Sequence, residues 1–397
     1  MDKFVIEGSQ PLKGTVVPSG NKNAAFPLMS AALLTDEPVT LHNLPDIGDV
    51  RTMLSIIEDM GIEVTHHNRH SATLRAGTLN KTIPDPSLFG DVRGALLLIG
   101  SMLAREGRID LPRPGGDQIG RRRIDTHLLA LQQLGARIDY DDQLVLSADR
   151  LHGADILLDE ASVTATENAL LAATTAEGTT ILRNAASEPH VQDLCQMLNA
   201  MGALIEGIGS NTLIIHGVER LRGADFTLGA DYLEVGSFIG LAAVTGSEVL
   251  IKDASPQYLR MTLLVYDRLG VCPEIRGNDV FVPAGQTLTV IPDLGDAIPK
   301  IDDSPWPGFP ADMMSVSIVV ATQSNGTVLF HEKMFESRLY FVDKLIGMGA
   351  RIVLCDPHRC IVQGPSPLQA EPQGISSPDI RAGMALLIAA LCARGTS

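Results

Sequence analysis

Helix-like apolar segments that end in a glycine and lead into a short strand recur along this chain. The segment "VRTMLSIIEDM" (50–60) precedes Gly61, and a stretch typical of a strand follows it. The same phrase reads "MGIEV" at 60, "LGARI" at 134, "MGALI" at 201, "LGVCP" at 269 and "MGARI" at 348. Glycine at this place is typical of a helix C-cap, so each phrase predicts a helix end followed by a strand.

A second phrase is interleaved at a similar period and predicts a helix end, a tight turn and a short alternating strand. It reads "TDEPVTLHN" at 35, "AREGRIDLP" at 104, "AEGTTILRN" at 176, "TGSEVLIKD" at 245 and "SNGTVLFHE" at 324, and a sixth start, "ARGTS", stands at 393. Six α/β units of about 70 residues are therefore predicted, the sixth incomplete. Because such units exceed the roughly 20 to 45 residues of solenoid repeats, we expect two globular α/β domains of three units each.

The composition is consistent with this organisation and excludes some classes of function. A chain of 397 residues is longer than a single domain with one hydrophobic core usually is. Its net charge of −16 argues against nucleic-acid binding, which needs a basic face. The start "MDKFVIEGSQ" lacks the apolar region of a signal peptide, and "MALLIAALCA" (384–393) is too short to span a bilayer. With five scattered cysteines, we expect a reduced, cytoplasmic protein without a membrane partner.

Two cations stand at the heads of apolar helix patterns, where the helix dipole disfavours positive charge. Lys22 lies in "PSGNKNAAFP" (18–27), with no acidic residue within four positions, and Arg93 opens the helix pattern in "GDVRGALLLIGSML" (90–103). An anionic ligand would explain both cations. For Lys22 the alternative is a solvated loop lysine.

A glycine-rich stretch with three adjacent arginines, "RPGGDQIGRRRIDTH" (113–127), is a second candidate site. Backbone N–H groups and guanidinium forks of such a stretch can enclose a phosphate. The alternative is a surface loop with a solvated charge run. His127 by itself is more typical of a hydrogen-bonded structural histidine than of a catalyst.

Asp312 in "PGFPADMM" (307–314) is the third candidate, since it enters the apolar pattern "MMSVSIVVA" (313–321). It is consistent with a helix N-cap or with a general base of raised pKa. The motifs for nucleotide-binding P-loops, dinucleotide binding, zinc hydrolysis and serine hydrolysis do not occur in the sequence. The remaining signal for a functional site is a set of cationic residues suited to binding an anionic ligand, without a metal-binding motif.

Together these stretches resemble the enolpyruvyl transferases, in particular the branch that acts on UDP-N-acetylglucosamine. The resemblance covers nearly the whole chain and is carried by "SGNKNAAFPLMSAALLTDEPVTLHNLPDIGDVRTM", "PGGDQIGRRRIDTHL", "ASVTATENALLAATTAEGTTILRNAASEPHVQDL", "GFPADMM" and "SPDIRAGMALLIAAL". It implies two inside-out α/β barrel domains, residues 22–229 and residues 1–21 plus 230–397, with the active site between them. It also implies a reaction without metal or cofactor.

The resemblance further implies which residues act. Asp117, Lys22 and Asp312 correspond to catalytic positions, and Lys22 is expected to have no protein partner because its partner is a substrate. Substrate contacts are implied at Lys22, Asn23, Arg93, Arg122, Arg123, Ile124, Asp125, Thr126, His127, Ser162, Val163, Thr164, Asp312, Arg338 and Arg381. In the family a later "IDRGYER"-like motif supplies one more arginine, which these 397 residues do not contain. Either this sequence is cut short or the chain lacks one substrate contact, and the incomplete sixth unit favours the first alternative.

The implied reaction moves the enolpyruvyl group of phosphoenolpyruvate to the 3′-hydroxyl of UDP-N-acetylglucosamine and releases phosphate, the first committed step of peptidoglycan synthesis. Asp117 stands where most relatives carry the cysteine that fosfomycin alkylates, which implies insensitivity to that drug. Two alternatives remain: a catalytically silent paralogue that binds the sugar nucleotide, and the relative that acts on shikimate 3-phosphate.

Overall fold

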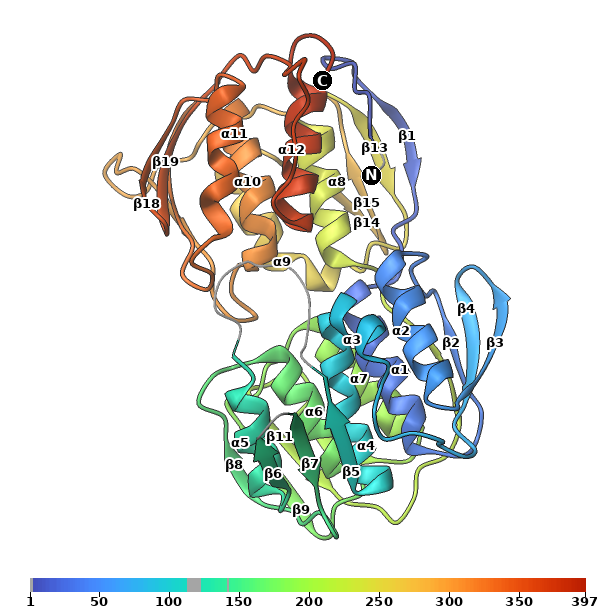
Figure 1. Cartoon of the computed structure of the whole chain (residues 1–397). Coiled ribbons are helices and arrows are strands. Elements are labelled where there is room, and N and C mark those ends of the chain that lie inside the picture. The colour runs from blue at the N-terminus through green and yellow to red at the C-terminus, as the bar shows by residue number, and fades with distance from the viewer. Residues whose placement is uncertain (1–2, 113–122, 141–142) are drawn as a thin grey trace. The chain divides into compact units, whose positions relative to one another are not determined.

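The computed structural model describes residues 3–112, 123–140 and 143–397 (Figure 1). These residues form two compact units. The inserted unit comprises the described residues of 19–229, and the discontinuous unit comprises 3–18 together with 230–397. Among all the described residues, no helix combines the length and the apolar character needed to cross a membrane.

The inserted unit contains seven of the described α-helices. Its helical segments are α1 (Lys22–Ala31), η1 (Ala32–Leu34), α2 (Gly48–Asp59), α3 (Pro86–Asp91), η2 (Arg93–Leu97), α4 (Leu98–Glu106), α5 (Asp125–Gln133), α6 (Val163–Ala173) and α7 (Pro189–Ala200). Its strands are β2 (Val39–His42), β3 (Glu63–Asn68), β4 (Ser71–Arg75), β5 (Arg108–Leu111), β6 (Arg137–Tyr140), β7 (Leu144–Ser147), β8 (Asp155–Leu157), β9 (Thr179–Arg183), β10 (Leu204–Glu206), β11 (Thr212–His216) and β12 (Ala224–Thr227).

The discontinuous unit repeats the same succession of helix, strand and hairpin. Its helical segments are α8 (Tyr232–Val244), η3 (Pro256–Tyr258), α9 (Arg260–Arg268), α10 (Ala311–Gln323), η4 (Arg338–Phe341), α11 (Val342–Gly347) and α12 (Ile380–Cys392). Its strands are β1 (Lys13–Val16), β13 (Glu248–Ile251), β14 (Glu274–Arg276), β15 (Asp279–Val282), β16 (Lys300–Asp302), β17 (Gly326–His331), β18 (Ile352–Asp356) and β19 (Arg359–Gly364).

The described residues form five sheets, of which the four-stranded ones share one topology. Their strand orders are β12-β2-β4-β3, β5-β7-β6 and β10-β11-β9-β8 in the inserted unit, and β1-β13-β15-β14 and β16-β17-β19-β18 in the discontinuous unit. In each four-stranded sheet a central strand pairs with an antiparallel hairpin on one side and with a parallel strand on the other. The second recurring phrase supplies β2, β5, β9, β13 and β17.

The glycines of the first phrase all adopt the left-handed backbone conformation that a C-cap requires. Their φ values are 101° at Gly61, 101° at Gly135, 102° at Gly202, 79° at Gly270 and 95° at Gly349. Each follows a helix and precedes a strand. A residue with a Cβ is strained at such φ values, so glycine allows each helix to end without this steric strain. The helix C-cap prediction is confirmed.

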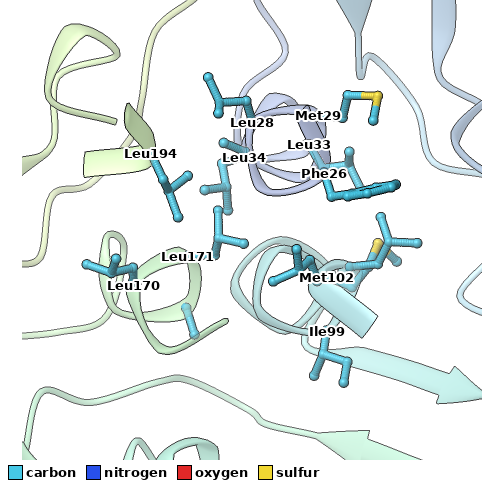
Figure 2. Close-up of a cluster of buried hydrophobic side chains, with 14 of the residues drawn as sticks. Phe26, Leu28, Met29, Leu33, Leu34, Ile99, Met102, Leu170, Leu171 and Leu194 are labelled. Carbon is cyan, nitrogen blue, oxygen red and sulfur yellow. The ribbon is translucent and has the colours of Figure 1, made fainter. Parts of the chain in front are cut away.

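Each unit has helices at its centre and sheets around them (Figure 1). In the inserted unit, α1, α4 and α6 bury apolar side chains on almost every face, and Figure 2 shows Phe26, Met102 and Leu171 meeting in this core. In the discontinuous unit, α8, α10 and α12 pack against one another in the same way. A helix that is apolar all round is stable only when it is enclosed, so these helices form the two cores.

Candidate active site

Lys22 begins α1, and its ammonium group is paired within the chain. The side chain of Asn21 caps the helix by accepting the N–H of Asn23 at 2.8 Å. The Lys22 Nζ atom lies 2.5 Å from Oδ2 of Asp49, which is in the first turn of α2. The expectation that Lys22 has no protein partner is therefore wrong. Both side chains remain partly exposed, and such a pair contributes little to folding stability.

Asp159 holds the start of the 123–127 stretch. The Arg123 Nη2 atom donates to Oδ2 of Asp159 at 2.9 Å, and its Nε atom donates to Asp125 at 3.2 Å. The Thr126 hydroxyl donates to Oδ1 of Asp159 at 2.7 Å. The hydroxyl of Thr126 holds the pKa of Asp159 below its usual range, with help from Arg123. Arg123 is thus part of an exposed ion-pair network.

His127 and Thr164 join the two predicted nucleotide-binding stretches. The Nε2 atom of His127 lies 3.0 Å from the Thr164 hydroxyl, and its Nδ1 atom lies 2.9 Å from Nδ2 of Asn168. The Asn168 amide oxygen accepts the N–H of Gly100, so its NH₂ group is the donor toward His127. Nδ1 of His127 is therefore an acceptor, and Nε2 carries the proton that Thr164 receives.

His127 is a neutral, enclosed histidine in this arrangement. Burial lowers its pKa to about 4, and the positive charge of Arg93 at the start of η2 acts in the same direction. Both ring nitrogens are used inside the unit, which fits the structural alternative. The substrate contact of His127 stays a prediction, and only its backbone atoms are left to make it. The contacts of Ile124 and Val163, at the starts of α5 and α6, also stay predictions that involve the backbone. Ser162 uses its hydroxyl to cap α6.

Asp312 lies in the first turn of α10 and accepts from two arginines. Its Oδ1 atom receives a hydrogen bond from Nη2 of Arg338 at 2.7 Å, and its Oδ2 atom receives one from Nε of Arg381 at 2.9 Å. The N-cap residue is Pro310, so the N-cap interpretation of Asp312 is wrong. Asp379 completes this group, because its Oδ1 atom lies 3.7 Å from Nη1 of Arg338 and caps α12. We call Asp312, Arg338, Asp379 and Arg381 the Asp312 cluster.

The two arginines keep Asp312 ionised. Burial acts to raise the pKa of this carboxyl, but the charges of Arg381 and Arg338 outweigh burial and hold the pKa below its usual range. The sequence-based alternative of a base with a raised pKa is therefore wrong for the protein without substrates. The same pairing raises the pKa of Arg381 despite its burial, and Asp231 adds to the effect.

Asp117 and Arg122 lie outside the described residues, within 113–122. Asn23 is placed at the mouth of α1 by the cap described above.

Three carboxylates that accompany the predicted cations were not among the residues predicted from the sequence. Asp49, Asp159 and Asp379 are separated from their basic partners by 27, 36 and 41 positions in the chain. Asp49 and Asp379 stand in or next to the first turn of a helix, where acidic residues are common for local reasons alone. A local signal for the pairing was therefore lacking.

A family model described as EPSP synthase (3-phosphoshikimate 1-carboxyvinyltransferase) matches residues 6–397. The chain belongs to this family. The UDP-N-acetylglucosamine 1-carboxyvinyltransferase of Bradyrhizobium diazoefficiens is 54% identical over 395 residues, covering 100% of this chain and 91% of that protein. The protein of the same name from Treponema denticola is 53% identical over 397 residues, covering 100% of this chain and 93% of that protein.

Solved structures agree with the family at the level of the fold. The enolpyruvyl transferase NikO from Streptomyces tendae superposes with a TM-score of 0.85 at 24% identity, covering 99% of this chain and 91% of that one. An EPSP synthase from Acinetobacter baumannii superposes with a TM-score of 0.72 at 17% identity, covering 99% and 92%. These solved structures therefore share the fold of this chain over almost its whole length.

Proposed function

We propose that this protein transfers the enolpyruvyl group of phosphoenolpyruvate to the 3′-hydroxyl of UDP-N-acetylglucosamine, with release of phosphate. One observation carries the proposal: relatives that are 48% to 54% identical across 100% of this chain bear the name of this activity. The reaction is the first committed step of peptidoglycan synthesis, and we place it in the cytoplasm.

Lys22 is suited to the phosphoenolpyruvate anion. An ammonium group has three N–H donors, and Asp49 occupies one of them, so Lys22 can hold Asp49 and a phosphate oxygen together. Asp49 also fixes the direction of the long side chain before the substrate arrives, which lowers the entropy cost of binding. In this role Lys22 stabilises the charge that develops as phosphate leaves. Arg93 and Arg122 are the further cations that we assign to phosphate and diphosphate.

The segment pair 123–127 and 162–164 is suited to the nucleotide. The His127–Thr164 hydrogen bond brings the two stretches together at the starts of α5 and α6. Helix N-termini present free N–H groups to anions and acceptors. We assign the uridine diphosphate end of the acceptor to this surface, with Asn23 as a contact to the sugar.

Asp312 is suited to accept the proton of the attacking 3′-hydroxyl. Its carboxylate is ionised, but two arginines make it a weak base. A substrate anion that binds Arg338 or Arg381 competes with Asp312 for the same donors and raises the pKa of Asp312. Basicity would thereby appear only when substrate is bound, which restricts proton transfer to the productive complex.

Asp117 supplies the other proton transfer in this proposal. The hydroxyl oxygen bonds to the carbon that bears phosphate and gives its proton to Asp312, while the methylene carbon takes a proton from Asp117. The tetrahedral intermediate then expels phosphate as its new methyl group returns a proton to the Asp117 carboxylate, which restores the enolpyruvyl double bond. The finer architecture belongs to the same proposal: two inside-out α/β barrels with the substrates held between the domains. Neither a metal nor a cofactor is needed, because the cations stabilise the charges.

The test is phosphate release from phosphoenolpyruvate in the presence of either UDP-N-acetylglucosamine or shikimate 3-phosphate. The proposal expects turnover with the sugar nucleotide only. Turnover with shikimate 3-phosphate alone would favour the activity after which the family model is named. Calorimetric binding of UDP-N-acetylglucosamine without any phosphate release would identify a silent sugar-nucleotide-binding paralogue.

A further inference from the structure

Two buried carboxyl groups stand side by side where strands β16 and β17 end. These strands are parallel, and their last register pair is Asp302 with His331. The next residue on each strand is acidic, Asp303 and Glu332, and both are 0% exposed. Buried carboxylates are rare unless they are paired with a cation or share a proton.

The two carboxyl groups accept hydrogen bonds from three successive backbone amides. The Lys333 N–H donates to Oδ1 of Asp303 at 2.5 Å, and the Met334 N–H lies 3.3 Å from Oδ2 of the same residue. Oε1 of Glu332 accepts from the N–H groups of Met334 at 3.2 Å and Phe335 at 3.0 Å. The segment 333–335 is therefore tied down by its own backbone.

The second oxygen of Glu332, Oε2, is buried, and within the described residues no N–H or O–H group of another residue donates to it. The carboxyl group of Asp303 lies within hydrogen-bonding reach of Glu332. Burial first, and then the neighbouring Asp303, raise the pKa of Glu332 to about 9, and the charge of Arg338 opposes them. At neutral pH Glu332 holds a proton that it can donate to Asp303.

Segment 333–335 contacts the Asp312 cluster through Phe335. The guanidinium carbon of Arg338 lies 4.9 Å from the centre of the Phe335 ring. Phe335 therefore contacts Glu332 through its backbone N–H and Arg338 through its ring. The Arg338 side chain is only 4% exposed and donates to Asp312. The backbone of Glu332 is fixed as well, because its N–H donates to the carbonyl of His358, whose Nδ1 lies 2.8 Å from the Glu332 carbonyl.

We propose that Glu332, by sharing its proton with Asp303, is a positioning residue that holds Arg338 on Asp312 through Phe335. Glu332 touches no reacting atom in this scheme. Its effect on catalysis passes through the arginine that sets the basicity and direction of Asp312, so the inference rests on the proposed function.

The first experiment is a double-mutant cycle on phosphate release. Glu332→Leu removes the donor and the acceptor, and we expect kcat to fall by about 10- to 100-fold, as for a small displacement of a catalytic group. Arg338→Lys lowers kcat on its own, and the double variant should lose no more than the larger single loss, because both changes disrupt one device. Losses that multiply would show that Glu332 does not act through Arg338.

Glu332→Gln keeps the experiment decisive if the leucine variant does not fold. The amide can donate to Asp303 and accept from Met334 and Phe335, as the protonated acid does, so kcat at neutral pH should stay within about threefold of wild type. A large loss in Glu332→Gln would contradict the shared proton. Asp343→Asn, at an exposed carboxylate in α11, is the control for removing one negative charge from the same unit.

The second experiment follows unfolding by urea and needs no substrate. A raised pKa means that the native protein keeps a proton that the unfolded chain releases above about pH 4.5, so the contribution of Glu332 to wild-type stability declines as pH rises from 4.5 toward 9. Glu332→Gln has no such proton, and its stability relative to wild type should increase steadily over that range. A difference that does not change with pH would overturn the pairing. If wild type shows no transferase activity, the proposed function fails while this measurement still decides on the pair.

Discussion

The Nη2 atom of Arg338 donates to Oδ1 of Asp312 at 2.7 Å and so joins the start of η4 to the first turn of α10. Arg338 is almost fully enclosed, whereas Asp312 keeps part of its surface open to solvent. A buried cation that is paired with a carboxylate is costly to leave alone, so Asp312 stabilises the placement of Arg338 as much as Arg338 sets the ionisation of Asp312. Substrate anions would compete with Asp312 for Arg338 and so change the ionisation of Asp312.

Lys22→Ala should lower kcat/KM, because the charge-stabilising donor is lost. The decrease should correspond to about 3 to 4 kcal/mol of lost transition-state stabilisation. Folding should survive, since the Lys22–Asp49 pair is partly exposed. Lys22→Arg should also be impaired, because a planar fork does not reproduce a compact point charge. Phosphate release and the unfolding midpoint are the measurements.

Lys81→Ala is the matched control for this prediction. Lys81 also pairs with an aspartate in the inserted unit, at 2.6 Å from Asp59, and is mostly exposed. It should retain wild-type kcat/KM. A fully active Lys22→Ala variant would refute the assignment of Lys22 to phosphoenolpyruvate.

Arg381→Met should move the acid limb of the pH–rate profile to higher pH. One of the two cations that lower the pKa of Asp312 is then missing, while burial still raises it. The fraction of ionised Asp312 at pH 5 to 6 should fall, and kcat should fall with it. An acid limb that stays where it is in wild type would show that Asp312 does not limit the reaction.

The contribution of His127 to wild-type stability should fall on acidification. The pKa of this ring is depressed from 6.5 in the unfolded chain to about 4 in the native protein, so its contribution is complete above pH 6.5 and is lost as pH falls through about 4. The loss amounts to at most about 3 kcal/mol. Comparing urea unfolding of wild type and His127→Gln from pH 7 to pH 4 measures it. His216→Gln is the control for an exposed histidine of the same unit.

Asp117 leads us to expect little or no inactivation by fosfomycin, since a carboxylate is a poorer nucleophile than a thiolate. Asp117→Cys should keep activity, gain time-dependent inactivation and shift the activity optimum to higher pH, because a free thiol titrates near 8.5 and a free aspartate near 3.9. Mass spectrometry of the drug-treated protein is the measurement. An added mass on 113–122 of the unmodified protein would overturn this expectation.

Local sequence was sufficient for the secondary structure around the repeats. The caps at Gly61, Gly135 and the later equivalents were predictable because a left-handed φ favours glycine wherever the rest of the chain lies. The strands of the second recurring phrase were predictable from alternation over four to six residues. Lys22, Arg93 and Asp312 stood out as charges at the starts of apolar helices, which is also a local signal.

The partners of those charges were decided only by the tertiary structure. Lys22 meets Asp49 because α1 and α2 pack together, and Asp312 meets Arg338 and Arg381 because α10 packs on α12 and lies beside η4. Asp303 and Glu332 become neighbours only through the register of β16 and β17. The sequence determined which residues carry charge and where each helix begins. Their pKa values were set by the packing of distant segments, because electrostatic interaction depends on distance in space and on burial, neither of which is local in the chain.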